Sequence, residues 1–147
     1  MSAAREYPGA PVLAASAAIF RDGRLLVARR GLPPLVGMWS FPGGVVELGE
    51  TLAEAVQREV REEVGCEVQL HDCIGHAEII IRDGAGRVSR HMVVACFAAE
   101  WLRGEVSCGP EATQIAWVDR DTLQTFQTTD RLAEFAARAA ARLQLPW

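Results

Sequence analysis

Apolar residues form short runs along the chain, separated by glycines and polar turns. The runs Val12–Phe20 and Leu25–Arg30 flank an Asp22-Gly23 pair, which is typical of a hairpin turn, so we predict two antiparallel strands there. Four further runs also predict strands: Met38–Val46 (interrupted by Pro-Gly-Gly), Val68–Ile81, Met92–Trp101 and Ile115–Val118. Two segments predict connections, namely the proline-containing loop Gly31–Gly37 and the polar turn Arg82–Arg87.

Two segments carry the periodicity of helices. Thr51 and Glu54 have the spacing of a capping box, and Gly65 stands where a left-handed C-terminal residue belongs. Between them, one apolar stripe is predicted from Ala53, Val56, Val60 and Val64. A second helix is predicted over Thr128–Leu143, with the following residues on its buried side: Leu132, Phe135, Ala136, Ala139 and Leu143.

The order of these elements predicts the fold class. Strands, a helix, more strands and a second helix indicate an α/β fold with a mixed sheet between helices. The chain has 147 residues and is 50% hydrophobic, enough for one domain with a buried core. Since no repeat or low-complexity linker divides it, residues 1–147 are predicted to form a single domain.

The composition lacks two residue types that many active sites need. All 15 residues in the Lys+Arg count are arginines, and the chain has no asparagine. This excludes a Schiff-base lysine, a phosphate-loop lysine and a Cys-His-Asn triad. Side-chain cations are therefore arginine, or histidine if protonated, and further positive charge must come from metal ions.

Charge and hydropathy set broader limits. The formal net charge of −4 argues against a non-specific nucleic-acid binder, because such proteins carry a basic face. No apolar run has the length of a membrane span, and the first eight residues lack a signal-peptide core, so a cytoplasmic protein without a membrane partner is expected. The four cysteines show no CxxC spacing and are expected to be reduced thiols.

Three carboxylates are predicted on one face of the first helix. Glu59, Glu62 and Glu63 stand at i, i+3 and i+4, where like charges cost about 0.2–0.5 kcal/mol per pair on an isolated helix. A hard divalent cation would offset this repulsion, since Mg²⁺ prefers oxygen ligands. The alternative is a solvated acidic helix face. The glycine-rich approach Phe41–Glu50 favours the metal, because its backbone can come close to a ligand.

The same residues resemble a known signature. Gly44, five residues, Glu50, seven residues and then Arg58-Glu59-Val60-Arg61-Glu62-Glu63-Val64-Gly65-Cys66 are similar to the box of the Nudix hydrolase family, GX5EX7REUXEEXGU, with U apolar. At the last apolar position of the signature this chain has Cys66 where Ile, Leu or Val is usual, and cysteine can pack there as a small hydrophobic residue. With the flanks Trp39–Gly44 and Glu111…Trp117-Val118, the resemblance covers about Val12 to Leu123. It implies an α/β/α sandwich.

The resemblance also implies roles for single residues. Implied metal ligands for Mg²⁺, with Mn²⁺ as a substitute, are Glu59, Glu63, the carbonyl of Gly44, and Glu62 directly or through water. The implied catalytic group comprises Glu50, Arg58, Glu62 and Glu111. Arg58 would orient the carboxylates, and Glu50 would orient them or deprotonate water. Glu111 would act as a base or late metal ligand, with a surface-loop glutamate as the alternative.

The implied reaction is attack of water on the diphosphate of a nucleoside diphosphate linked to another moiety. The wider pattern is similar to a short bacterial branch labelled ADP-ribose pyrophosphatase-like, which favours an ADP-ribose-like substrate. The alternatives are an oxidised nucleoside triphosphate as substrate and a catalytically silent domain that senses a nucleotide. Weaker substrate candidates are Arg29, Arg30, Phe41 and Arg90, whose alternatives are solvated arginines and a core aromatic. Family members are often dimers, so a homodimer stays open.

Overall fold

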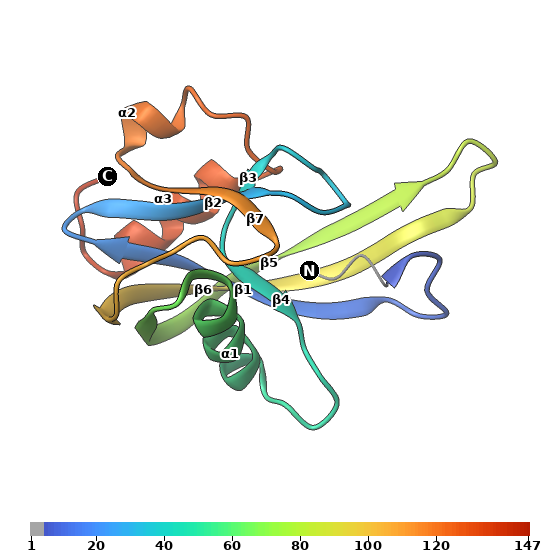
Figure 1. The fold of residues 1–147 in the computed structure, drawn as a ribbon, viewed down its shortest axis with the longest axis horizontal. Helices are drawn as coiled ribbons and strands as arrows, with labels where there is room; N and C mark the ends of the chain where they lie inside the picture. The colour runs from blue at the N-terminus through green and yellow to red at the C-terminus, as the bar shows by residue number, and fades with distance from the viewer. Residues whose placement is uncertain (1–4) are drawn as a thin grey trace.

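The computed structural model describes residues 5–147, and its centre is one mixed sheet (Figure 1). The strands are β1 (Val12–Arg21), β2 (Arg24–Arg30), β3 (Trp39–Ser40), β4 (Gly43–Val45), β5 (Glu67–Arg82), β6 (Val88–Arg103) and β7 (Ala112–Val118). Five of them follow the order β3-β2-β1-β6-β5, while β4 also pairs with β1 and β7 also pairs with β2.

Strand β1 lies at the centre of this sheet. Its sequence is mainly small and apolar, and its residues from Ala14 to Phe20 are buried, as expected for a strand covered on both faces. It runs parallel to β6, from the pair Val12–Met92 to the pair Phe20–Glu100, and antiparallel to β2 and β4. The predicted mixed sheet is therefore confirmed.

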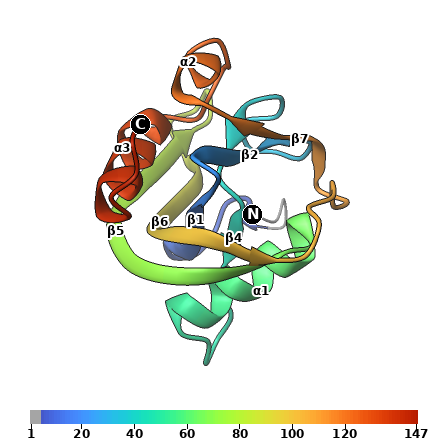
Figure 2. The same ribbon diagram turned by 90° about the vertical axis from the view of Figure 1, so that its left-hand side faces the viewer.

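Helices cover the two faces of the sheet, which Figure 2 shows end-on. Helix α1 (Leu52–Val64) packs against one side of β1 through Val56, Val60 and Val64. Helix α3 (Leu132–Arg142) packs against the other side through a second apolar cluster that includes Leu132 and Ala136. A single-turn helix, α2 (Arg120–Leu123), follows β7.

Helix α1 begins and ends where the sequence predicts. The Thr51 side chain accepts from the Glu54 N–H and the Glu54 side chain accepts from the Thr51 N–H, so the capping box is complete. Gly65 ends the helix with a left-handed φ of 75°. One detail of the stripe was wrong: Ala55 is buried, whereas the predicted Ala53 is only half-buried.

Other element boundaries differ from the prediction. Helix α3 begins at Leu132 instead of Thr128, because the chain before it forms an irregular connection in which Arg131 has a positive φ of 65°. Strands β5 and β6 extend to 16 residues each, and α2 carried too little periodicity to be predicted. No helix within residues 5–147 is long and apolar enough to cross a membrane.

Candidate active site

Two glycines bring strand β4 close to its neighbours. Gly43 pairs with Ser16 and Gly44 with Ala15 on β1. A β-carbon on Gly43 would collide with the carbonyl of Ala15, and one on Gly44 would lie 2.6 Å from both carboxylate oxygens of Glu59. Any larger residue would push β4 away from β1 and from the acidic face of α1, which accounts for the Gly-Gly pair.

Arg58 connects the carboxylates of the acidic face. Its Nε and Nη2 donate to the two oxygens of Glu50, at 2.6 and 2.9 Å. Its Nη1 donates to Glu59 at 2.8 Å and to Glu62 at 3.3 Å, and Nη2 also donates to the Val45 carbonyl. The long Arg58 side chain therefore lies across the carboxylates of Glu50, Glu59 and Glu62. A planar guanidinium can make this set of contacts, whereas an ammonium group cannot.

Glu63 lies on α1 in a largely desolvated position. Burial raises the pKa of Glu63 to about 7, and the nearby charges of Glu59 and Glu111 add to the effect, while the Gly43 N–H, which donates to Glu63 Oε2 at 3.1 Å, opposes it. The loop between β6 and β7 brings Glu111 near, since the Gly109 N–H donates to the Glu63 carbonyl at 2.8 Å. Glu59, Glu63 and Glu111 thus concentrate negative charge in a partly desolvated place.

The chemistry of these donors fits a divalent cation. Within residues 5–147, no three Asp, Glu, His or Cys side chains gather closely enough to hold a metal ion by themselves. Carboxylates of Glu59 and Glu63 beside the backbone of Gly44 are the hard oxygen donors that Mg²⁺ accepts, and Mg²⁺ usually takes few protein ligands and completes its shell with water and phosphate. Glu62 is 61% exposed at its side chain and lies at the rim.

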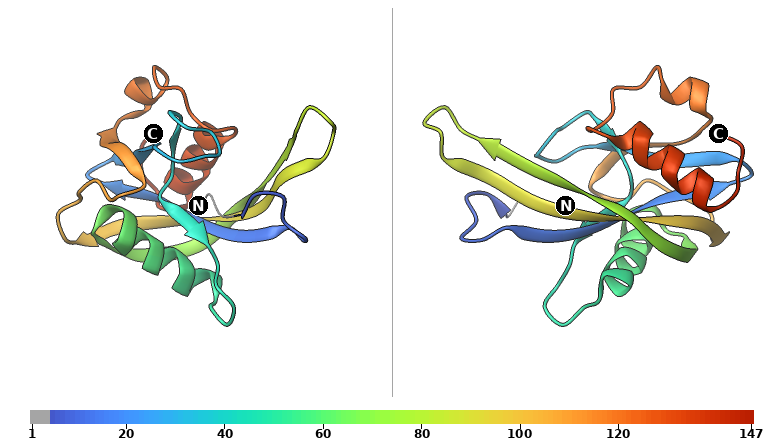
Figure 3. Two further views of the ribbon diagram at one scale, coloured as in Figure 1. Left: turned by 45° about the vertical axis from the view of Figure 1, so that its right-hand side comes forward. Right: turned by 180° about the vertical axis from the view of Figure 1, so that it is seen from behind.

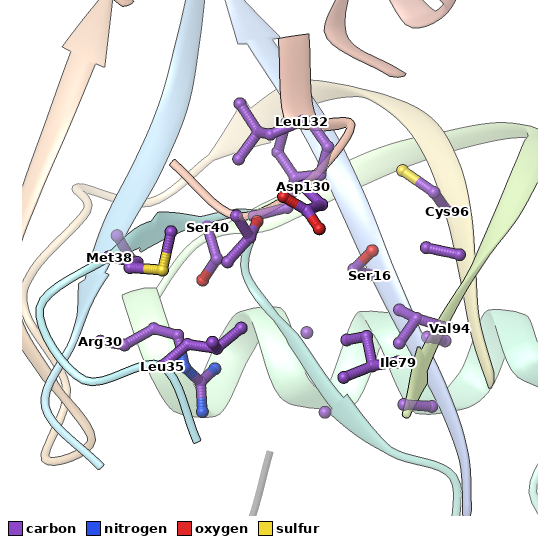
Figure 4. Close-up of a pocket in the computed structure, with 18 of the residues that line it drawn as sticks. Ser16, Arg30, Leu35, Met38, Ser40, Ile79, Val94, Cys96, Asp130 and Leu132 are labelled. Carbon is purple, nitrogen blue, oxygen red and sulfur yellow. The ribbon is translucent and has the colours of Figure 1, made fainter. Parts of the chain in front are cut away.

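A cavity of about 320 Å³ adjoins this acidic group. Gly44, Glu63 and Glu111 contribute to its lining. The rest is mainly apolar and includes the labelled Leu35, Met38, Ile79, Val94 and Leu132 (Figure 4). One end of the cavity can therefore hold an apolar, flat group while the other offers carboxylates.

The four substrate candidates fall into different positions. Arg29, Arg30 and Phe41 line the cavity. Arg29 donates to the Gly37 carbonyl and to Gln114, so it braces the loop after β2. Arg30 donates to the Pro34 carbonyl at 2.6 Å, and burial lowers its pKa, with Glu63 and Glu111 acting in the opposite direction.

Arg90 lies on β6 and is only 6% exposed. Its Nη1 is buried, and no hydrogen-bond acceptor for it is found in the described part of the chain. It alternates onto the same face of β6 as Met92 and Val94, the second of which lines the cavity. The positive charge of Arg90 contributes to lowering the pKa of Arg30, so the two guanidinium groups lie near each other.

Sequence reasoning missed several residues that line the cavity. Ser16, Ser40, Cys96 and Asp130 all have labelled side chains there (Figure 4). Asp130 was placed on a helix, but it belongs to the connection before α3. Trp39, in contrast, stacks on Phe126 with ring centroids 4.6 Å apart and packs against the apolar cluster under α3.

Comparisons with known proteins identify the family of this chain. The family model of the NUDIX domain matches residues 10–141, so the chain belongs to the Nudix family, as the signature box predicted. The chain is 32% identical to an ADP-ribose pyrophosphatase of Methanocaldococcus jannaschii over 77% of its own length and 64% of that protein. It is 30% identical to the nucleoside triphosphatase NudI of an Enterobacter species over 71% of its own length and 77% of that protein. It thus spans slightly less than two thirds of the first relative.

A solved structure, a NUDIX hydrolase from Nitrosomonas europaea, superposes with a TM-score of 0.73 over 92% of both chains. At 16% identity this likeness concerns the fold alone. The predicted α/β sandwich is confirmed by it and by the mixed sheet between α1 and α3.

Proposed function

We propose that this chain is a divalent-metal-dependent hydrolase that cleaves the diphosphate bond of a nucleoside diphosphate derivative, and that residues 1–147 are one Nudix domain. The observation that carries the proposal is the buried Glu63, which lies with Glu59 and Glu111 beside an apolar cavity. Carboxylates gathered in a partly desolvated place are the hard oxygen donors that a divalent cation such as Mg²⁺ accepts. A cavity next to them supplies a place for the substrate's nucleoside.

Glu59, Glu63 and the carbonyl of Gly44 would hold Mg²⁺ or Mn²⁺, with Glu62 contributing through water. When bound, the metal would neutralise the diphosphate and lower the pKa of a water. Arg58 keeps the Glu59 carboxylate oriented through the 2.8 Å hydrogen bond.

Glu50 and Glu111 take different parts in this proposal. The hydrogen bonds from Arg58 hold the pKa of Glu50 at about 2, and the Glu47 N–H adds to the effect. A carboxylate of such low basicity is a poor acceptor for a proton from water at neutral pH. We therefore assign Glu50 to orienting Arg58, and Glu111 to accepting the proton of the attacking water.

The arginines would bind the anionic part of the substrate. Arg30, which lines the cavity, would donate to a phosphate oxygen, and the positive charge of Arg90, buried near Arg30, would add to the attraction. The flat nucleobase would enter the apolar part of the cavity, beside Phe41. ADP-ribose is the favoured substrate, supported by the ADP-ribose pyrophosphatase relative. The nucleoside triphosphatase relative supports a triphosphate, such as an oxidised deoxynucleotide, as the second candidate.

A substrate panel with product identification tests the proposal. ADP-ribose, related dinucleotides and nucleoside triphosphates are incubated with Mg²⁺ or Mn²⁺, and products are separated by anion exchange. AMP with ribose 5-phosphate is expected; a nucleoside monophosphate with pyrophosphate would move the assignment to the second candidate. Glu63→Gln should lower turnover by orders of magnitude while circular dichroism stays unchanged. Background rates across the whole panel would instead identify a silent nucleotide-sensing domain.

A further inference from the structure

Strand β5 is at the edge of the sheet and has an unusually long, apolar end. It spans 16 residues and, within residues 5–147, pairs with β6 alone. The hairpin of β5 and β6 projects beyond the body of the protein (Figures 1 and 3). An exposed edge strand carries unpaired backbone groups and is a template for pairing with another chain.

Helix α3 covers only the first part of this edge. Arg138 donates to the carbonyl of Ile74 at 3.4 Å, and Arg131 donates to the carbonyl of His76 at 3.3 Å. Because they accept from α3, these carbonyls face away from β6. Backbone groups of successive residues point to opposite sides of a strand, so every second residue of β5 shares this direction. The backbone carbonyl of Ile81, by contrast, faces β6, where it accepts a hydrogen bond from the Ser89 hydroxyl. The backbone groups of Glu78 and Ile80 therefore point outward, beyond the reach of the two α3 arginines.

The sequence of this uncovered segment is its own antiparallel complement. Residues 78–82 read Glu-Ile-Ile-Ile-Arg, and Glu78, Ile80 and Arg82 are exposed on one face. In an antiparallel pair of two identical copies centred on Ile80, Glu78 of each copy faces Arg82 of the other. In a pair centred on residue 79 or 81, Glu78 and Arg82 would no longer lie opposite each other. Opposite charges directly across two strands are favourable.

We propose that two copies of this chain associate through the β5 edges, forming a two-fold antiparallel pair centred on Ile80 that continues the sheet from one copy into the other. Ile80, which is 50% exposed in the single chain, would be covered by the same residue of the second copy. The outward backbone groups of Ile80 would exchange hydrogen bonds across the axis.

The present contacts of the two charged residues are compatible with this pairing. Glu78 Oε1 lies 3.5 Å from His76 Nε2, a solvent-exposed contact of little stabilising value. Arg82 donates to the Gly86 carbonyl at 3.0 Å through Nη1, and its guanidinium has further N–H groups to offer. Because the paired segment is short, we expect an association that depends on protein concentration.

Sedimentation velocity over a concentration series tests the proposal. The wild type should form dimers. Glu78→Arg and Arg82→Glu should each give monomers, because like charges would face each other in the pair. The double variant Glu78→Arg/Arg82→Glu restores the complement and should form dimers again, with circular dichroism confirming the fold of all variants. A monomeric wild type, dimers in both single variants, or a folded but monomeric double variant would overturn the proposal.

A cross-linking experiment tests the register directly. In a background with Cys73 and Cys108 replaced by serine, Ile80→Cys should form a disulfide-linked dimer under mild oxidation, since position 80 would face itself. The matched control is Leu102→Cys, which is 47% exposed on β6 and lies far from the proposed axis. Equal cross-linking of the two variants would contradict the register.

Discussion

The α-carbon of Gly44 lies directly against the carboxylate of Glu59. A β-carbon at position 44 would be 2.6 Å from each oxygen of that carboxylate, closer than real β-carbon contacts come. On its other side, Glu59 Oε1 accepts the 2.8 Å hydrogen bond from Arg58. The glycine therefore determines where a proposed metal ligand can stand.

Gly44→Ala should displace the Glu59 carboxylate and lower kcat by about 10²-fold, the scale of a misplacement of about 1 Å in a catalytic group. The Mg²⁺ concentration for half-maximal activity should rise as well. Gly84→Ala is the control, because a β-carbon there has nothing within 4 Å and the residue has no positive φ. Wild-type kinetics in the Gly44 variant would contradict the metal assignment at β4.

Glu63 gives a pH-dependent prediction. Since burial raises its pKa to about 7, the metal-free folded protein holds a proton that the unfolded chain has lost above its ordinary value of 4.5. The contribution of Glu63 to stability therefore falls as pH rises toward and through 7. In EDTA, the stability of the wild type relative to Glu63→Gln should fall by about 1 kcal/mol between pH 6 and pH 8. Urea unfolding at both pH values measures this.

Glu62→Gln is the matched control for that experiment. Glu62 carries the same charge on the same helix, but its side chain is largely exposed and accepts a 3.3 Å hydrogen bond from Arg58 Nη1. Its variant should keep the same stability difference from wild type at both pH values. If the stability difference from wild type changed with pH equally in both variants, the effect would come from the charge of the helix as a whole and not from the burial of Glu63.

The sequence predicted the parts of this protein that local rules determine. The capping box at Thr51 and the left-handed Gly65 depend on neighbours within a turn, and both are confirmed. The spacing of Glu59, Glu62 and Glu63 likewise placed them on one helix face. The contacts of Arg58 do not follow from such local rules, and only the family resemblance implied them, because they depend on where β4 and the Glu50 loop pack against α1.

The cavity could not be predicted from local patterns because its walls come from distant parts of the chain. Ser16, Cys96 and Asp130 meet only through the parallel pairing of β1 with β6 and the irregular connection before α3. Arg90 was a weak candidate at a strand start, and its burial depends on the strands around it. No periodicity in the sequence signals either feature.

Glu50→Gln tests the pair between Arg58 and Glu50. Because Arg58 lowers the pKa of Glu50 to about 2, the pair contributes stability above the ordinary value of 4.5, and the contribution is lost as pH falls toward 2. The wild type should therefore be more stable than Glu50→Gln at pH 7, and the difference should shrink progressively at pH 4 and pH 3. Glu47→Gln is the control, since Glu47 is mostly exposed and 3.9 Å from Arg58. A difference that is constant with pH would show that the pair does not depend on the charge of Glu50.

Arg90→Met separates substrate binding from folding. Arg90 is buried, and its Nη1 has no hydrogen-bond acceptor among residues 5–147, so burying its charge is unfavourable. An apolar side chain of similar length removes that penalty. We therefore expect the substrate-free variant to be at least as stable as the wild type in urea, while KM for the diphosphate substrate rises several-fold, because the attraction of a nearby positive charge for the diphosphate is lost. Since Arg90 is proposed to attract the diphosphate through its charge and not to touch the attacked water, kcat should change less than KM. A variant that unfolds more easily and keeps its KM would instead make Arg90 a structural residue.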